Sequence, residues 1–442
     1  MSSIPVLVRE VQALRARLSG GACGADAGQL IELVAALEEL KSAACAAQAE
    51  AAAAFDGIRR EERAIAGVPE SRQGRGIAHE IALARKESPF RGRTLLGLGK
   101  ALVAEMPHTL ARLRDGTLSE HRAQILVQET ACLTREDRSL VDRELCSDPS
   151  TLTGVGNRTL TARAKRLGAE LDPAALARRA RKAEADRHVS IRPAPDTMGY
   201  LSVLLPVGQA VAAYAALRRA AEGARAAGDP RSLGQLMSDL ALARLTGVPD
   251  SGNPEQSPAV PVGVNLCLST ATLAGGHAPA SLTAPGVGEV TLPAEVARLL
   301  LSRALSTGVG AWFRRLFYNP QGTLVAMSSR RRVFPTGMAD FLAQRGLGIC
   351  ANPYCDAPVR HADHIRSVVE GGATTTVNGQ GLCEACNHAK QAAGWRQRAI
   401  QPRGHRLTVE TTTPTGHRYR SRAPAPPGWH EPFPLEIHFL TA

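Results

Sequence analysis

The sequence predicts a mainly α-helical, multidomain protein: a helical N-terminal domain with a few β-hairpins, followed by a small domain stapled by zinc. Three observations support this fold class. The chain of 442 residues is too long for one ordinary domain. Apolar residues recur at intervals of three and four over most of the first 186 residues, as in amphipathic helices. Two cysteine pairs then lie close together in a short C-terminal stretch.

The longest predicted helix runs from Gln29 to Phe55, where leucines and alanines occupy the spaced apolar positions. It could form a coiled-coil seam or one arm of a helix bundle, and the alanines at its later positions favour the bundle. Further helices are predicted over Ile77–Arg85, Leu95–Glu105 and Pro173–Arg187.

Two more helices in this region are predicted to begin with a capping box. Thr117 with Glu120, and Thr134 with Asp137, have the spacing at which an N-cap hydroxyl accepts a hydrogen bond from the third amide of the helix. Three histidines stand singly among these helices, and each is predicted to be a cap or a surface residue rather than a metal ligand: His79, His108 and His121.

The middle of the chain changes to a period of two at His188, so His188–Arg192 and Tyr200–Leu205 are predicted to pair as a hairpin. The Gly-, Ala- and Pro-rich stretch from Ala274 to Gly288 is predicted to be a mobile loop. The other predicted elements are helices over Gln209–Ala221, Leu233–Thr246, Pro293–Ser306 and Thr336–Gln344, a linker over Val248–Pro261, a strand over Val262–Ser269, a hairpin within Phe313–Met327 and another between Leu407–Thr412 and His417–Ser421.

These elements predict a division of the chain into five parts. The first 300 residues contain no phosphate-binding loop, nucleophile elbow or dinucleotide-binding turn, so no catalytic set is predicted there. The predicted parts are a helical domain at 1–186, a mixed helix and strand continuation at 187–306, a connector at 307–346, the zinc-stapled domain at 347–400, and a hairpin with a Pro-rich tail at 401–442.

The net charge of +12 falls mostly after residue 300. A basic region attracts polyanions, although general solubility is an alternative explanation. The chain opens without a basic and apolar leader and has nine cysteines, an odd number, so we expect a cytoplasmic protein without a disulfide framework. Its longest apolar run, Leu201–Leu217, is interrupted by Pro206 and Gly208, so no membrane role is expected.

The two cysteine pairs predict a structural zinc site. Cys350 and Cys355 form a CxxxxC knuckle, and Cys383 and Cys386 form a CxxC knuckle. Four thiolates on two tight turns suit a tetrahedral Zn²⁺ that is closed to water. Because so short a segment buries little core, the metal is expected to supply folding free energy directly.

Between the knuckles lies an Asp-His pair, Asp363 and His364. A neutral imidazole can take a proton from water, and a carboxylate oxygen suits Mg²⁺ or Mn²⁺, so the pair could generate and aim a nucleophile. Neighbouring side chains of a strand point to opposite faces, and the two would therefore reach one ligand only where the strand is bent or twisted.

The stretch from Cys350 to Trp395 resembles the HNH, or ββα-metal, endonuclease core of the four-cysteine type. The resemblance implies a structural Zn²⁺ and a catalytic Mg²⁺ or Mn²⁺. By position in the motif, His364 would be the general base that activates water, and Asp363 a ligand of the catalytic ion. Asn378 would hold the loop and the imidazole of the base in orientation, and Asn387 would be the second ligand of the ion.

The chain departs from the motif at its last position, where Asn387 replaces histidine. An amide oxygen is a reasonable ligand for Mg²⁺. The following His388 points about 100° away on a helix and is not expected to substitute for it. The basic residues in and around the core are predicted to contact nucleic acid: Arg360, Arg366, Lys390 and Arg396.

A wider resemblance covers more of the chain. The phrase GQGLCEACN, the Ala393-Gly394-Trp395 motif, the hairpin from Thr412 to Pro424 and the preceding helical region resemble a bacterial family, typical of actinobacteria. In that family a domain of unknown function, number 222, precedes a C-terminal HNH nuclease. The implied function is a metal-dependent endonuclease acting on double-stranded DNA, with the N-terminal region positioning DNA or mediating assembly. The alternatives are a catalytically inactive zinc-knuckle protein that binds DNA or a partner, and an RNA-cleaving enzyme.

Overall fold

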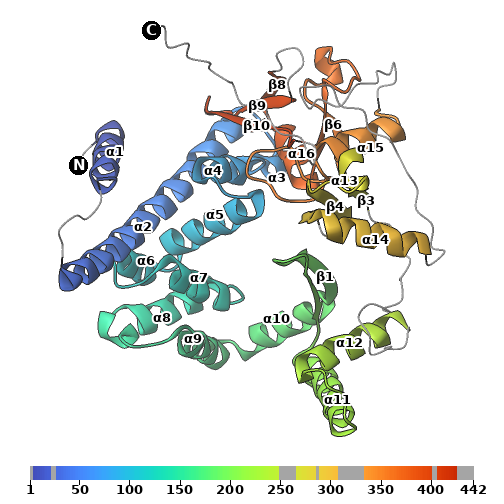
Figure 1. The fold of residues 1–442 in the computed structure, drawn as a ribbon. Helices are drawn as coiled ribbons and strands as arrows, with labels where there is room; N and C mark the ends of the chain where they lie inside the picture. The colour runs from blue at the N-terminus through green and yellow to red at the C-terminus, as the bar shows by residue number, and fades with distance from the viewer. Residues whose placement is uncertain are drawn as a thin grey trace, which may run out of the picture. The chain divides into compact units, whose positions relative to one another are not determined.

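The computed structural model describes residues 3–20, 26–247, 265–284, 288–306, 333–400 and 406–425 (Figure 1). Helices dominate the chain and small antiparallel sheets complete it, so the predicted fold class is confirmed. The chain forms two compact units, residues 1–65 with 94–179, and residues 66–93 with 180–442. The first unit is thus interrupted by a segment that belongs to the second. None of the helices in the described ranges is long and apolar enough to cross a membrane.

The first unit is a bundle of helices around an aliphatic core. The predicted helix Gln29–Phe55 is part of the much longer α2, and its Ala49 lies so close to α5 that a side chain at Gly99 would meet the Ala49 carbonyl at 2.5 Å. Leu102, Leu126 and Leu160 are fully buried at the centre. The helices of this unit are α1 (Ile4–Leu18), α2 (Ala27–Ile65), most of α5 (Pro89–Ala104), α6 (Pro107–Arg114), α7 (Glu120–Glu129), α8 (Arg135–Cys146), η1 (Pro149–Leu152), α9 (Asn157–Leu171) and the start of α10 (Pro173–Ala185).

One of the two predicted helix caps is correct. The Thr134 hydroxyl accepts from the Asp137 amide at 3.1 Å and begins α8. The cap predicted at Thr117 is wrong, because α7 begins with Ser119 as its N-cap. The Thr117 hydroxyl instead donates to the Asp115 carboxylate at 2.5 Å, within the turn that precedes the helix.

In its described residues, the second unit combines helices of varied length with four small antiparallel sheets. The hairpin predicted around His188 is present as β1 and β2, and the helix predicted over Leu233–Thr246 is α12. Its elements are α3 (Glu70–Gln73), α4 (Ile77–Arg85), β1 (His188–Pro193), β2 (Gly199–Leu204), α11 (Val207–Ala226), α12 (Leu233–Thr246), β3 (Asn265–Cys267), α13 (Thr270–Leu273), β4 (Ala280–Ala284), β5 (Gly288–Leu292), α14 (Ala294–Ser306), α15 (Thr336–Arg345), β6 (His361–His364), η3 (Val368–Glu370), β7 (Gly379–Leu382), α16 (Glu384–Lys390), β8 (Arg396–Ala399), β9 (Thr408–Thr412) and β10 (Arg418–Arg422).

The loop predicted over Ala274–Gly288 is wrong in its second half. Strand β4 lies there and pairs with β3 on one side and β5 on the other. Ala280 is buried against Leu292 and Ala297, so a small side chain serves there as a core residue. The predicted linker Val248–Pro261, the predicted hairpin within Phe313–Met327 and most of the Pro-rich tail lie outside the described residues.

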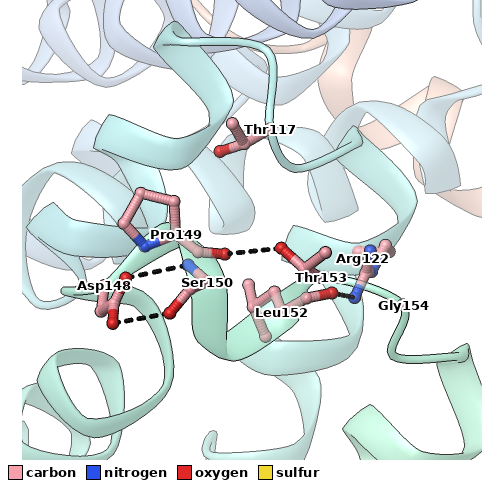
Figure 2. Close-up of a pocket in the computed structure, with 8 residues that line it drawn as sticks. All are labelled: Thr117, Arg122, Asp148, Pro149, Ser150, Leu152, Thr153 and Gly154. Atoms are coloured by element: carbon pink, nitrogen blue, oxygen red, sulfur yellow. Dashed lines mark hydrogen bonds between the residues drawn. The ribbon is translucent and has the colours of Figure 1, made fainter.

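A pocket of about 640 Å³ opens beside η1 in the first unit (Figure 2). Its polar groups form hydrogen bonds that stabilise the backbone of η1. The Asp148 carboxylate accepts from the Ser150 amide and hydroxyl, and the Arg122 guanidinium donates to the Leu152 carbonyl. These residues maintain the local backbone and do not form a catalytic set.

Candidate metal centre and active site

The four cysteines form a compact metal-binding cluster. Their sulfur atoms all lie within 4.8 Å of one another, and the Sγ atoms of Cys355 and Cys383 are 3.8 Å apart. A tetrahedral ion with Zn–S bonds of about 2.3 Å requires sulfur atoms about 3.8 Å apart. All four side chains are buried. The cluster predicted from the spacing therefore fits a structural Zn²⁺.

Backbone hydrogen bonds and turn conformations shape both knuckles. In the first, the Cys350 amide donates to the Ala357 carbonyl at 2.9 Å, and Tyr354 takes a left-handed conformation with φ of 60°. In the second, Cys383 is the N-cap of α16, and its Sγ accepts from the Cys386 amide at 3.4 Å. An amide donor and a helix N-terminus both favour the thiolate form that zinc requires.

Strands β6 and β7 form the hairpin that carries the Asp-His pair. Helix α15 packs on one face, where Ala362 contacts the cluster of Phe334, Met338 and Leu342. The close approach of α15 requires glycine opposite His364, because a Cβ on Gly379 would lie 2.7 Å from a methyl group of Leu342. Helix α16 follows β7 and lies against β6 (Figure 1). Two of its side chains form hydrogen bonds on the other face of the hairpin.

Asp363 lies on the face of the hairpin that contacts α16. Its Oδ2 accepts from the Lys390 Nζ at 2.5 Å and from the Gln380 Nε2 at 3.1 Å. Lys390 also donates to the His364 carbonyl, and Gln380 is the residue opposite Asp363 in the strand register. The carboxylate is therefore held by one cation and one amide.

His364 lies on the face that contacts α15. Its Nε2 is 2.9 Å from the Thr374 hydroxyl, and the centroid of its ring is 4.3 Å from that of Phe334. Burial lowers the pKa of His364, Asp363 opposes this shift and Lys390 adds to it. The lowered pKa favours the neutral imidazole. The two neighbouring residues of the motif take different partners, as the alternation of side chains along a strand requires.

Asn378 ties together the two ends of the loop between β6 and β7. Its Oδ1 accepts from the Arg366 amide at 2.9 Å, and its Nδ2 donates to the Arg366 and Ala373 carbonyls at 3.1 and 2.8 Å. The same loop carries Thr374, the hydrogen-bond partner of His364. Asn378 thus fixes the backbone that orients the imidazole.

Asn387 presents an unused oxygen on the α16 side of the hairpin. Its Nδ2 lies 2.8 Å from the Nδ1 of His361, which shares a face of β6 with Asp363. Its Oδ1 is buried and accepts no hydrogen bond from the residues that the structure describes. A buried amide oxygen is costly to leave unsatisfied and is a suitable ligand for a divalent ion.

His361 was not among the predicted site residues, although its spacing of two from Asp363 on a strand places both side chains on one face.

The four residues predicted to contact nucleic acid differ in their exposure and their partners. Lys390 is engaged with Asp363, whereas Arg360, Arg366 and Arg396 have exposed side chains.

The segment 66–93 packs against this core within the second unit. The Glu80 carboxylate accepts from the Thr415 hydroxyl at 3.0 Å, and a Cβ on Gly76 would lie 2.7 Å from the Nε1 of Trp395. His79 is neither a cap nor a surface residue, and that prediction is wrong. Burial, with a smaller effect of Arg93, lowers its pKa to about 4, and its ring interacts with the Ala385 backbone beside the second knuckle. A contact between residues so far apart in sequence leaves no local pattern.

A hairpin and helix closed by four cysteines define the ββα-metal class of domain, and residues 350–393 match the HNH endonuclease family. Residues 34–345 match the family described as domain of unknown function (DUF222), so the chain belongs to that family. The resemblance drawn from the sequence is confirmed. No curated protein and no solved structure matches the chain.

Proposed function

We propose that the protein is a metal-dependent endonuclease that hydrolyses phosphodiester bonds of double-stranded DNA in the cytoplasm. The observation that carries the proposal is the buried Asn387 Oδ1, an unsatisfied oxygen on the side of the hairpin where Asp363 also lies. These two oxygens would hold the catalytic ion. Mg²⁺ or Mn²⁺ bound there would neutralise charge on the phosphate during hydrolysis.

The other residues of the site are not proposed as ligands of the ion, and each has a separate role. Burial favours the neutral form of His364, which would accept a proton from the attacking water. This role requires its imidazole to reach from the α15 face of the hairpin to the α16 face, where the ion would lie, and Thr374 is the hydroxyl that holds the ring in the present position. Asn378 keeps the Thr374 loop in place. Lys390 balances the charge of Asp363 and is near enough to the site to contact a phosphate oxygen. The helical N-terminal domain, predicted at residues 1–186, would position DNA or mediate assembly.

The test is cleavage of supercoiled plasmid DNA by the full-length, zinc-loaded protein with added Mg²⁺ or Mn²⁺. We expect nicked or linear product from the wild type and a rate about 10² to 10⁴ times lower for His364→Ala, because a general base contributes about that much. His388→Ala is the matched control, since it removes a neighbouring imidazole that has no assigned role. Equal rates for wild type and His364→Ala would overturn the assignment of the base.

The Lys390–Asp363 ion pair favours a second candidate, a catalytically inactive zinc-knuckle protein that binds DNA or a partner. A lysine ammonium at the carboxylate occupies the place where a cation would bind. This candidate requires DNA binding without cleavage under any divalent ion. Lys390→Ala separates the two: the enzyme should retain its requirement for metal, and the binding protein should remain inactive.

A further inference from the structure

Strands β8, β9 and β10 form a three-stranded antiparallel sheet in the order β10-β9-β8. The sheet begins at Arg396 and ends at Arg422, beyond the last residue of either family match. Alternate residues of each strand point to the same face. On one of these faces β8 and β10 supply only arginines, which we call the arginine face: Arg396, Arg398, Arg418, Arg420 and Arg422.

The strand register arranges the arginine face in rows. Arg398 and Arg420 flank Glu410 on β9, and Arg396 and Arg418 flank Thr412. Neighbouring arginines on one strand are about 6.8 Å apart, and those on β8 and β10 are about 10 Å apart across β9. All five arginines are exposed to solvent.

Glu410 fixes the central row. Its Oε1 accepts from the Arg398 Nη2 at 2.7 Å and its Oε2 from the Arg420 Nε at 3.0 Å, and Glu410 itself is only 2% exposed. The side chains of Arg398 and Arg420 remain 65% and 67% exposed, and each guanidinium group has five N–H donors, so donors remain for a ligand. Glu410 is the one carboxylate that the three described strands place on this face, against five arginines, so the strands present an excess of positive charge there.

The opposite face of the sheet is anchored to the candidate active site. Val409 is buried with Ile365 and Leu407. Gln397 accepts from the Gln380 Nε2 at 2.6 Å, and the same amide group donates to Asp363 at 3.1 Å. The arginine face is therefore held on a rigid element that is hydrogen-bonded to the catalytic hairpin.

We propose that the arginine face binds the phosphate backbone of duplex DNA and holds it beside the nuclease core, an inference that rests on the proposed function. Guanidinium groups bind phosphate oxygens in a bidentate manner. The other side chains on this face of the three described strands are threonine and glutamate. They offer no aromatic surface of the kind on which single-stranded bases stack, so the face suits a duplex and contacts it without reading its sequence.

The experiment measures binding of a fluorescent duplex by the full-length, zinc-loaded protein over a range of KCl concentrations without Mg²⁺ or Mn²⁺. The test variant is Arg396→Gln with Arg418→Gln, because neither residue neighbours Glu410 in the register and the carboxylate keeps its partners. The control with the same change of charge is Arg219→Gln with Arg225→Gln, two exposed arginines on α11.

We expect the slope of log K against log salt concentration to fall in magnitude by about two in the test variant and to stay unchanged in the control, since each phosphate contact contributes about 0.9. Affinity at physiological salt should fall at least 10-fold. Equal slopes and affinities for the two variants would overturn the proposal. Tighter binding of single-stranded DNA or RNA than of the duplex, lost in the test variant, would overturn the assignment to duplex DNA.

The same proteins separate this inference from the proposed function. His364→Ala should bind the duplex like the wild type. A wild type that binds with this salt dependence but never cuts refutes the nuclease and leaves the arginine face in place. A wild type that cuts, with a test variant that binds like the control, refutes the arginine face alone. Circular dichroism and zinc content establish that each variant is folded.

Discussion

The interior of the first unit is built from aliphatic side chains, whereas the interior around the two cysteine knuckles is built largely from sulfur. In the first unit, buried polar groups serve the helices: the Asp142 carboxylate accepts from the His108 and Thr109 amides at 2.8 Å at the start of α6. Around the hairpin, a buried amide oxygen of Asn387 has no partner among the described residues. We therefore expect the first unit to fold on packing alone and the core around the knuckles to require metal.

The sharpest test of this difference is removal of zinc. Cys383→Ser, or a strong chelator, should unfold the segment around the knuckles, because structural zinc contributes about 10 to 16 kcal/mol to the folding of small domains. The helices of the first unit should remain folded. Hydrogen exchange measured peptide by peptide distinguishes the two regions. Cys132→Ser is the control, and loss of protection throughout the chain would show that the two cores do not differ in this way.

The converse test weakens the first unit. Leu126 is fully buried, and Leu126→Ala should lower the free energy of unfolding of that unit by about 2 to 5 kcal/mol through loss of packing and creation of a cavity. Leu140, which is 39% exposed on α8, supplies the control Leu140→Ala. Thermal denaturation followed by circular dichroism measures the effect. Zinc content should not change, and its loss would mean that the metal site depends on the aliphatic core.

Two glycines give the smallest expected effects, of opposite sign in the two regions. Gly76→Ala should destabilise the second unit by about 1 to 3 kcal/mol, because φ is 81° there and the new Cβ would lie 2.7 Å from the Trp395 Nε1. Gly57→Ala, inside α2 with open space around it, should stabilise the first unit by about 0.5 to 1 kcal/mol. Denaturant titration with tryptophan fluorescence and circular dichroism measures both. Destabilisation by Gly57→Ala would contradict the open environment described for α2.

Elements with a strong local signal were predictable from the sequence. Helix α4 spans the predicted Ile77–Arg85, because apolar spacing and the stop before Pro89 act within one helix. The zinc ligands were predictable because the CxxxxC and CxxC spacings are local, and the geometry of the four sulfurs fits a zinc ion.

Features that depend on distant partners were not predictable. Strand β8 carries alternating arginines that resemble a solvated loop, and only its pairing with β9 makes it a strand. Four of the five residues of strand β4 are small or polar, and its register with β3 and β5 is set by the sheet. His361 contacts Asn387, and His79 contacts the Ala385 backbone, both on α16. The residues next to each histidine in the sequence give no sign of these contacts.

The packing of α4 against the nuclease core also constrains the order of events during synthesis. Glu80 and its hydrogen-bond partner Thr415 are 335 residues apart in the chain. At a translation rate of about 5 to 20 residues per second, Glu80 is made roughly 17 to 67 s before Thr415. The helices on both sides of α4 can assemble meanwhile. Helix α4 therefore lacks its contacts with the β9–β10 hairpin until that hairpin has been synthesised.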